Sequence, residues 1–483
     1  MNIVDPILFQ CKYHPPAAAI CVPGSGQSLV SYARLERLTH NASRMAVAAG
    51  LRRGNTVAIF IEDAILNTAV VLGLTRIGVV TLAGRHDVPK DLTIDALVTD
   101  KIMMQPLIAA RVILVNATWT SGDGEPLQDS RLYETDEDDV CRIILTSGTT
   151  GEPKAVGLTH RMLANRIARH PYLMGNRLSR CDRIYCDFGL GTSLGFQFLI
   201  YSLWRGGTII LSGPDHQSTI QSFDLYKVQG LIGSPACLAG FTKFYEQYSQ
   251  FQPSFEIAIV GGSQLSPSLS RRARASLCPN IVAAYGATET SMVASASART
   301  IESVPGAVGY VTPDMTVEIV DESERTLAQG QEGLVRVRGP YSISSYHRRE
   351  NLSDGSFRGG WFYPGDTGSL TADGLLLIAG REQTVVNVGG DKIRPEALEA
   401  TLSAFPGVEE AAVLSVKSDL GIDQLCAVVV PRNNYDEKAL ETYCLAKFPR
   451  AFVPARFVAV SELPRNEMGK IDRQQLARLI QPN

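Results

Sequence analysis

Residues 146 to 160 read TSGTTGEPKAVGLTH, and the interpretation of the whole chain begins there. The apolar run IILT at 143–146 and the run AVGLT at 155–159 predict a strand on each side of a loop. The loop SGTTGEPK at 147–154 is rich in hydroxyls and backbone N–H groups, which can wrap an anion such as phosphate, and Lys154 adds a positive charge. The alternative is a mobile surface hairpin, and the loop alone does not decide between the two.

The spacing of this loop differs from that of a P-loop. A P-loop places its lysine directly after a glycine and runs straight into a helix. Here two residues separate Gly151 from Lys154, and the next element is predicted to be a strand. The helix is expected later, with Thr159 as its N-cap.

Short apolar runs alternate with helical stretches over most of the chain. Expected strands are TVAIFI at 56–61, VQGLIGS at 228–234, IAIVGG at 257–262 and IVAAYG at 281–286, and expected helices include 64–74 and 266–277. This alternation predicts an α/β fold: a large N-terminal, multi-layer domain with mostly parallel sheets. Ligands of such sheets bind beyond the carboxyl ends of the strands, where the small-residue loops lie.

The pattern changes near residue 380. Residues 361–381 carry only strand and turn signals, whereas 394–405 predicts a helix with Pro395 in its first turn. Strands are expected at 408–416, 426–430 and 455–463. We therefore expect an N-terminal domain at 1–379 and a small, mobile C-terminal α/β domain at 380–483.

Composition narrows the class of protein. With 46 Lys and Arg against 49 Asp and Glu, the net charge of −3 offers no general attraction to nucleic acid or to anionic membranes. The nine cysteines are scattered without a CxxC pair, which suits buried thiols in a reducing cytoplasm. The N-terminus has no signal-peptide pattern, and the longest uncharged run, 188–204, is expected to be core rather than a membrane span.

Several segments in the same order resemble the AMP-forming adenylating enzymes, which include acyl- and aryl-CoA synthetases, peptide-synthetase adenylation domains and firefly luciferase. TSGTTGEPKAV is similar to their phosphate loop and AYGATETS (284–291) to their adenine and magnesium motif. EGLVRVRGPYSISSY (332–346), WFYPGDTG (361–368), GREQTVVNVGGDKIRPEALE (380–399) and LPRNEMGKIDRQQL (463–476) resemble later signatures. The closest resemblance is to aryl- and acyl-CoA ligases.

The resemblance implies that ATP and Mg²⁺ bind the N-terminal domain. The β- and γ-phosphates would be held by Thr146, Ser147, Gly148, Thr149, Thr150, Gly151 and Lys154. Tyr285 would stack on adenine, Thr288 would reach the α-phosphate, and Glu289 with Thr149 would hold the metal ion. Asp366 would bind the ribose with help from Arg381. Taken singly, Tyr285 is equally a core aromatic and Asp366 a turn residue.

Lys470 would bridge the carboxylate and the α-phosphate during adenylation, and a compact ammonium suits that place. Outside the family comparison it is simply a lysine in a glycine loop. Rotation about a hinge at 380–383 would then exchange Lys470 for the loop 386–393, with Gly389 and Gly390 lining a thiol tunnel. The family's hinge residue is Asp or Lys, and here it is Gln383.

The acid pocket implied by the resemblance lies around residues 188–193, 233–235, 261–263 and 284–287. Its expected lining is Phe188, Gly191, Ser193, Ser234, Gly261, Gly262, Gly286 and Ala287. Ser193 stands where amino-acid-activating relatives carry Asp, which argues against an α-amino acid and leaves an aromatic acid favoured. The expected acceptor is CoA, the alternative is phosphopantetheine on a separate carrier protein, and an inactive nucleotide-binding relative is a third possibility. Arg348 and Arg349 are available for the CoA phosphates.

Overall fold

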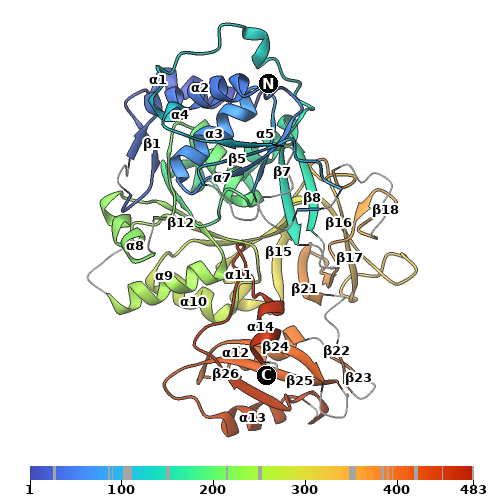
Figure 1. The fold of residues 1–483 in the computed structure, drawn as a ribbon. Helices are drawn as coiled ribbons and strands as arrows, with labels where there is room; N and C mark the ends of the chain where they lie inside the picture. Colours follow the sequence, from blue (N-terminus) through green and yellow to red (C-terminus); the bar gives the residue numbers. More distant parts are fainter. Residues whose placement is uncertain are drawn as a thin grey trace.

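The computed structural model describes residues 1–25, 29–84, 88–89, 91–101, 111–147, 153–213, 216–248, 253–347, 355–381, 386–388, 391–393, 395–417, 423–448 and 450–480. They form a large N-terminal part and a smaller C-terminal part, which lies below it in Figure 1. The expected α/β class is confirmed.

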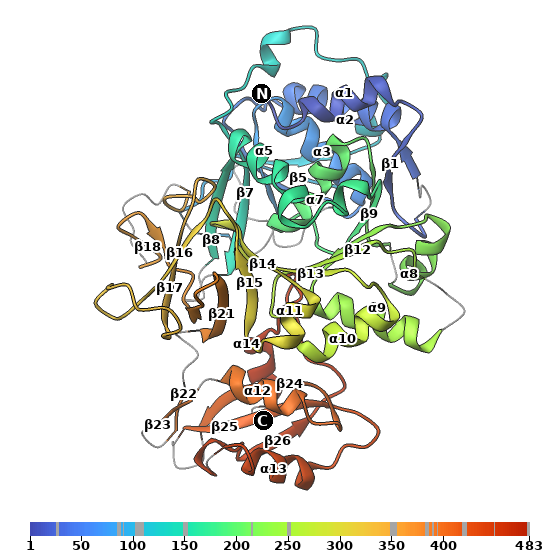
Figure 2. The same ribbon diagram turned by 180° about the vertical axis from the view of Figure 1, so that it is seen from behind.

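The core of the large part is a 15-stranded sheet whose first half is parallel. In spatial order its parallel strands are β1 (Ala18–Cys21), β10 (Thr208–Ile210), β9 (Arg183–Cys186), β11 (Gly230–Gly233), β12 (Ile257–Val260) and β13 (Ile281–Ala287). Every residue of β11 and β12 is buried, as expected for strands covered on both faces. α7 (Ser193–Trp204) packs on one face, and α8 (His216–Leu225), α9 (Pro235–Gln247) and α10 (Pro267–Ser276) pack on the other (Figure 2).

The second half of this sheet is antiparallel, which the sequence pattern did not distinguish. β14 (Ser291–Ser297) returns from β13, and β15 (Ala307–Val311), β21 (Leu375–Arg381), β20 (Asp366–Leu370) and β17 (Gly333–Arg338) continue the order. β2 (Leu29–Ser31), β16 (Thr316–Val320), β18 (Phe357–Arg358) and β19 (Trp361–Phe362) complete it, and α11 (Ala298–Ser303) follows β14. The pairing of β20 with β21 sets Asp366 directly opposite Arg381.

A second sheet carries the strands on either side of the glycine-rich loop at 147–154. Its order is β6 (Val112–Leu114), β5 (Ala96–Thr99), β3 (Thr56–Phe60), β4 (Val80–Ala83), β7 (Val140–Ser147) and β8 (Pro153–Thr159), and α2 (Tyr32–Ala48) and α3 (Ala64–Arg76) pack on each other. The antiparallel β7–β8 hairpin encloses residues 148–152, which lie outside the described residues. Thr159 caps the following α5 (His160–Ala168), because its side chain accepts a hydrogen bond of 3.1 Å from Met162 N.

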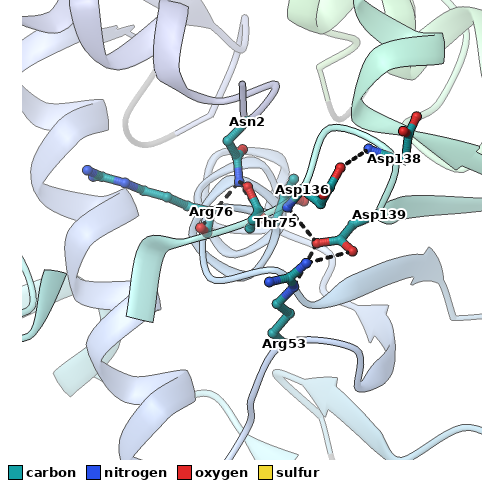
Figure 3. A network of polar contacts seen from close by, with 8 residues as sticks. Asn2, Arg53, Thr75, Arg76, Asp136, Asp138 and Asp139 are labelled. Carbon is teal, nitrogen blue, oxygen red and sulfur yellow. Dashed lines mark hydrogen bonds and ion pairs between the residues drawn. The ribbon is translucent and has the colours of Figure 1, made fainter. Parts of the chain in front are cut away.

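A polar network fixes the base of this hairpin (Figure 3). Asn2 donates its side-chain amide to the carbonyls of Thr75 and Arg76, which ties the N-terminus to the end of α3. Arg53 pairs at 2.7 Å with Asp139, the residue before β7. On the other side of the hairpin, Ile3 N donates to His160 Nδ1 at 3.1 Å. Both strands are therefore anchored at the end opposite the loop.

The C-terminal part has its own sheet and core. β24 (Val408–Lys417), β25 (Asp423–Pro431) and β26 (Arg456–Ala459) form a three-stranded sheet, while β22 (Val386–Val388) and β23 (Asp391–Ile393) pair separately. α12 (Pro395–Ser403) and α13 (Glu437–Leu445) share one cluster of buried side chains with this sheet, and α14 (Arg473–Ile480) shares the other. The α12 residue Glu399 pairs at 2.8 Å with Arg473 of α14, which joins the two layers. Pro395 begins α12 as expected, and β26 is shorter than the predicted 455–463 strand.

All nine cysteines are buried and free, in agreement with their expected role as core thiols. The uncharged run at 188–204 forms the buried α7 and the loop before it. Among the described residues, no helix is both long and apolar enough to cross a membrane.

Candidate active site

The residues singled out by sequence converge at the carboxyl ends of the parallel strands. Phe188 follows β9, Ser234 follows β11, Gly261 follows β12, and Tyr285 lies near the end of β13. The first three positions follow strands of the same sheet and Tyr285 lies close to the end of the next one, so adjacent strand ends bring them to one edge. In α/β sheets this edge is where ligands bind.

The loop that carries Lys470 reaches this edge from the C-terminal part. Asn466 closes the loop, because its backbone N–H donates to Lys470 O at 2.8 Å and its side chain accepts from Lys470 N at 3.1 Å. Gly469 has a φ of 69°, which favours glycine, and a β-carbon there would lie 2.4 Å from Ser234 Oγ. A β-carbon on Gly262 would lie 3.3 Å from Met468 O. The two parts of the chain are therefore in direct contact at this loop.

Lys470 is surrounded by charges from the large part. Burial lowers the pKa of its ammonium below the ordinary 10.5, and Arg381 lowers it further, while Asp366 and Glu289 act in the opposite direction. A lysine on a freely solvated loop would not show these influences. Lys470 therefore lies near this edge of the large sheet, within reach of the charges of Asp366 and Glu289.

Asp366 forms the centre of a second group. Its carboxylate accepts a 2.6 Å hydrogen bond from Tyr285 Oη and pairs at 2.9 Å with Arg381 Nε. Burial raises the pKa of the Tyr285 phenol well above its ordinary value, and the Asp366 charge adds to that shift. Tyr285 therefore remains a neutral donor, and its hydrogen bond to Asp366 fixes the position of its ring.

Glu289 is buried and is held by an aromatic residue that the sequence argument did not single out. Tyr346 Oη donates to Glu289 Oε1 at 3.1 Å. Lys154 Nζ lies 5.0 Å from the centroid of the Tyr346 ring and donates to Ser356 Oγ at 3.3 Å. The ring of Tyr346 thus connects the lysine of the phosphate loop with the carboxylate of the adenine motif.

Arg166 on α5 supports the same motif from below. It is fully buried, and its guanidinium donates to the carbonyl oxygens of Thr288 at 2.9 Å, Glu289 at 3.2 Å and Tyr341 at 2.6 Å. Burial lowers the pKa of Arg166 to about 10, while the Glu289 charge acts to raise it. These bonds fix the backbone of Thr288 and Glu289 from a helix more than a hundred positions earlier.

The expected acid pocket is lined by small groups close to the Lys470 loop. Ser234 is buried, and its hydroxyl caps α9 by accepting from Cys237 N at 3.2 Å. A β-carbon on Gly262 would touch the Phe188 ring at 3.6 Å, and one on Gly261 would lie 3.3 Å from Leu194 Cδ1. Ser193 is buried, and its hydroxyl accepts a 2.8 Å hydrogen bond from the side-chain amide of Gln197 on the same helix, α7.

Gly286 and Ala287 lie at the end of β13, where the pairing with β14 shifts register after Tyr285. A β-carbon on Gly286 would lie 2.1 Å from Ser291 O, so only glycine fits.

Some predicted residues cannot be placed. Outside the described residues lie Gly148, Thr149, Thr150, Gly151, Arg348, Arg349, Gln383, Gly389 and Gly390, and nothing is described of the Ser147 side chain. Thr146 on β7 pairs with Lys154 on β8, and the Thr146 hydroxyl donates to the Lys154 carbonyl at 3.5 Å.

The donors present fit a magnesium ion bound mainly by phosphate oxygens. In the described part of the chain no three His, Cys, Asp or Glu side chains form a metal-binding group. A buried carboxylate, that of Glu289, is available next to the phosphate-loop strands. Magnesium in nucleotide sites commonly uses one or two carboxylates together with substrate phosphates, so a single Glu is sufficient.

The structure thus has a large and a small α/β part, and a lysine of the small part lies at the edge of the large sheet beside Asp366 and Glu289. The chain belongs to the AMP-binding enzyme family: the family profile matches residues 9–347, and the profile of the AMP-binding enzyme C-terminal domain matches residues 397–470.

Comparisons with individual proteins agree with this family membership. The 2-succinylbenzoate–CoA ligase of Geobacillus sp. (strain WCH70) is 24% identical over 480 residues, covering 95% of this chain and 94% of that protein. The 3-hydroxybenzoate–CoA/4-hydroxybenzoate–CoA ligase of Thauera aromatica is 25% identical, covering 94% and 92% respectively. The solved structure of o-succinylbenzoate coenzyme A synthetase from Bacillus subtilis with ATP and magnesium ion superposes with a TM-score of 0.83 at 22% identity, covering 98% of this chain and 99% of that one.

Sequence reasoning missed Arg166 and assigned no role to Tyr346, although Tyr346 ends a quoted motif. Both act through contacts with Glu289 that span more than fifty positions along the chain. An aromatic at the end of the 332–346 motif was a usable signal, whereas nothing in the local sequence around Arg166 indicated its partners.

Proposed function

We propose that this protein activates a carboxylic acid with ATP and transfers the acyl group to CoA, releasing pyrophosphate and AMP. The observation that carries the proposal is the position of Lys470, which reaches from the C-terminal part into the charge field of Asp366 and Glu289. This position supports the proposal, because an attacking carboxylate and an α-phosphate would both need a positive charge between them.

In the first half-reaction a carboxylate oxygen attacks the α-phosphorus, a new P–O bond forms, and the bond to pyrophosphate breaks. Lys470 offsets the charge of the two approaching anions, and Thr288 binds the α-phosphate. Lys154 and the loop Thr146–Gly151 hold the outer phosphates. Glu289 and Thr149 would hold Mg²⁺, which neutralises phosphate charge when bound.

The nucleoside would lie against Tyr285 and Asp366. The phenol of Tyr285 is tied to Asp366, so ring and carboxylate are positioned together. Stacking on the ring would hold adenine, and the free oxygen positions of Asp366, with Arg381, would receive the ribose hydroxyls. Preorganisation of this kind reduces the entropic cost of binding.

In the second half-reaction the thiol releases its proton to solvent, its sulfur forms a bond to the acyl carbon, and the bond between that carbon and the phosphate oxygen breaks, so that AMP departs. We assign the domains to 1–379 and 380–483, with the hinge at 380–383 and Gln383 within it. Rotation about this hinge withdraws Lys470 and presents Gly389 and Gly390 as the thiol tunnel. Removing Lys470 therefore blocks the first step and spares the second.

The expected acid pocket best suits an acid that carries an aromatic ring. The segment 188–193 has small residues, and Ser193 is engaged by Gln197 rather than offering a carboxylate to a substrate ammonium. The relatives named above act, by their names, on 2-succinylbenzoate and on hydroxybenzoates. The proposed acceptor is CoA. We propose no nucleic acid or membrane as a partner, and we place the reaction in the cytoplasm. Arg348 and Arg349 are candidates for its phosphates.

The test is acid-dependent exchange of labelled pyrophosphate into ATP over a panel of aromatic, aliphatic and amino acids. We expect exchange with an aromatic acid and none with α-amino acids. CoA and a pantetheinylated carrier protein are then compared as acceptors. Transfer only to the carrier would overturn the choice of CoA. ATP binding without exchange for any acid would indicate an inactive relative.

The role of Lys470 is tested in both half-reactions. Lys470→Ala should abolish exchange while retaining thiol transfer from supplied acyl-adenylate. Lys438→Ala, at an exposed position on α13, is the matched control and should leave both steps intact. Equal loss of both steps in Lys470→Ala would contradict the assignment.

A further inference from the structure

Arg142 is a buried cation with unused hydrogen-bonding capacity. It lies on β7, only 1% exposed, and its guanidinium donates to Thr81 Oγ1 at 3.2 Å and to Leu190 O at 2.6 Å. It also lies 4.8 Å from the centroid of the Phe196 ring. Its Nε is buried without a hydrogen-bond acceptor, and Arg142 forms no ion pair among the described residues. A buried charge without a counter-charge is costly unless something else supplies it.

Two other buried arginines show the usual solutions. Arg166 donates to three backbone carbonyl groups, and all its nitrogens are engaged. Arg169 has a counter-charge, because it forms an ion pair with Asp314 and lies over the Tyr341 ring, although its Nε and Nη1 are also buried without an acceptor. Arg142 has neither arrangement, and burial lowers its pKa to about 10. At neutral pH its charge therefore persists in a desolvated position.

A cavity of about 230 Å³ opens beside this guanidinium. Its walls include Arg142, Ala83, Phe188, Leu190 and Gly191, so it lies between β4, β7 and the loop after β9. It is smaller than the pockets that enclose whole drug-sized ligands, and suits one end of a ligand. No neighbouring atom lies within 4 Å of where a Gly189 β-carbon would stand, so the wall is open there.

One residue, Phe188, lies both at the cavity and next to the Lys470 loop. Phe188 lines the cavity, and the same ring lies 3.6 Å from the β-carbon position of Gly262. That position is 3.3 Å from Met468 O, two residues before Lys470. A ligand whose reacting carboxylate lies at Lys470 could therefore extend past Phe188 into the cavity.

We propose that Arg142 binds a second carboxylate of the acid substrate, at the end opposite the carboxylate that is adenylated. This rests on the proposed function and narrows its substrate class to dicarboxylic acids. A carboxylate in the cavity supplies the missing counter-charge.

Two acidic residues also line the cavity, and both already have partners. Asp187 accepts a 2.9 Å hydrogen bond from Tyr185 Oη, and Glu62 pairs with Lys101 at the exposed rim. Asp187 is only partly buried, so water can solvate its charge, whereas Arg142 is 1% exposed and has no counter-charge among the described residues. This asymmetry favours an anionic over a cationic ligand group.

The experiment compares each dicarboxylate with its own monoamide, which matches it in shape but lacks the second charge. The series is the three benzenedicarboxylates and the linear dicarboxylates of four to six carbons, measured by pyrophosphate exchange with the full chain. For at least one pair we expect kcat/KM to favour the diacid by about 10- to 100-fold, the range for a charge-assisted contact. Arg142→Met should remove most of that preference and Arg142→Lys should retain part of it. Arg169→Met, a buried ion-paired control, should leave the preference unchanged.

A second readout does not need activity. The diacid preferred in exchange, or each in turn if none exchanges, should raise the thermal midpoint of the wild type and not that of Arg142→Met. Binding that depends on Arg142 without any exchange would retain the site and refute the proposed function. Exchange with monoacids but no diacid preference, or equal loss for both members of a pair in Arg142→Met, would overturn the inference. Equal stabilisation by inorganic phosphate, without discrimination between diacid and monoamide, would also overturn it by indicating a free-anion site.

Discussion

Gly469 lies so close to Ser234 that a β-carbon on residue 469 would come within 2.4 Å of the Ser234 hydroxyl oxygen. One residue belongs to the loop carrying Lys470 and the other to the N-cap of α9 in the large part. The approach of Lys470 to Asp366 and Glu289 therefore depends on the absence of a side chain beside it.

Gly469→Ala should consequently impair adenylation. The added methyl group clashes with Ser234 and occupies a φ of 69° that alanine adopts poorly. We expect the pyrophosphate-exchange rate to fall by about 10-fold or more, with a smaller change in thiol transfer from supplied acyl-adenylate. Gly374→Ala is the control, because its φ is 83° but no atom lies within 4 Å of the added carbon. If the two variants behave alike, backbone strain rather than contact with Ser234 is responsible.

The pH dependence of adenylation should report Lys470. Burial and Arg381 lower its pKa below 10.5, and the ammonium is the form that offsets phosphate charge. As pH rises through that lowered pKa the ammonium is lost, so kcat/KM for exchange should fall on the alkaline side at a pH below 10.5. Lys470→Arg keeps a charged group at higher pH, so its alkaline limb should move upward even where its rate is lower. An alkaline limb at the same pH in both proteins would assign the titration to another group.

The local elements were predictable because their signals are local. Thr159 has the residue type and position of an N-cap, and its hydroxyl does accept from Met162 N. Pro395 begins its helix, as its preset φ allows. The buried strands read as continuous apolar runs, which need no knowledge of their partners.

The antiparallel half of the large sheet was harder to predict. Residues 291–297 and 307–311 are short strands whose direction depends on turns and partners, and the alternation of strands and helices that indicated parallel pairing ends at β13. Direction is decided by tertiary pairing, and not by the residues of one strand.

In the candidate site too, residues within local motifs could be predicted from the sequence, and residues that act through long-range contacts could not. Glu289, Asp366 and Lys470 were chosen from motifs, and the structure places them around one edge. The residues that hold them were not accessible in this way. Arg166 meets Glu289 across 123 positions, and Tyr346 meets it across 57. Such contacts follow from the fold and leave no spacing pattern.

Tyr346→Phe tests one of these supports. The change removes the hydroxyl that donates to Glu289 at 3.1 Å and keeps the ring beside Lys154. A lost hydrogen bond to a buried charge is worth about 1.5–3 kcal/mol, so we expect the KM for MgATP to rise or kcat to fall by about 10-fold or more. Tyr310→Phe removes an exposed 3.3 Å bond to Asp373 and should have little effect. A Tyr346→Phe enzyme with unchanged dependence on Mg²⁺ concentration would show that this bond does not position Glu289.

Arg166→Gln tests the support beneath the adenine motif. Glutamine cannot reach the carbonyls of Thr288, Glu289 and Tyr341 together, so buried acceptors lose their donors. We expect the free energy of unfolding to fall by about 2–4 kcal/mol. Because the same bonds fix the backbone of the nucleotide-binding motif, the KM for ATP should rise even at temperatures where the variant is fully folded. Arg161 lies on the same helix as Arg166 and forms an exposed ion pair with Asp138, so Arg161→Gln should change the stability little and leave the KM unchanged. A destabilised Arg166→Gln protein with a normal KM for ATP would restrict Arg166 to stability and remove it from the positioning of Glu289.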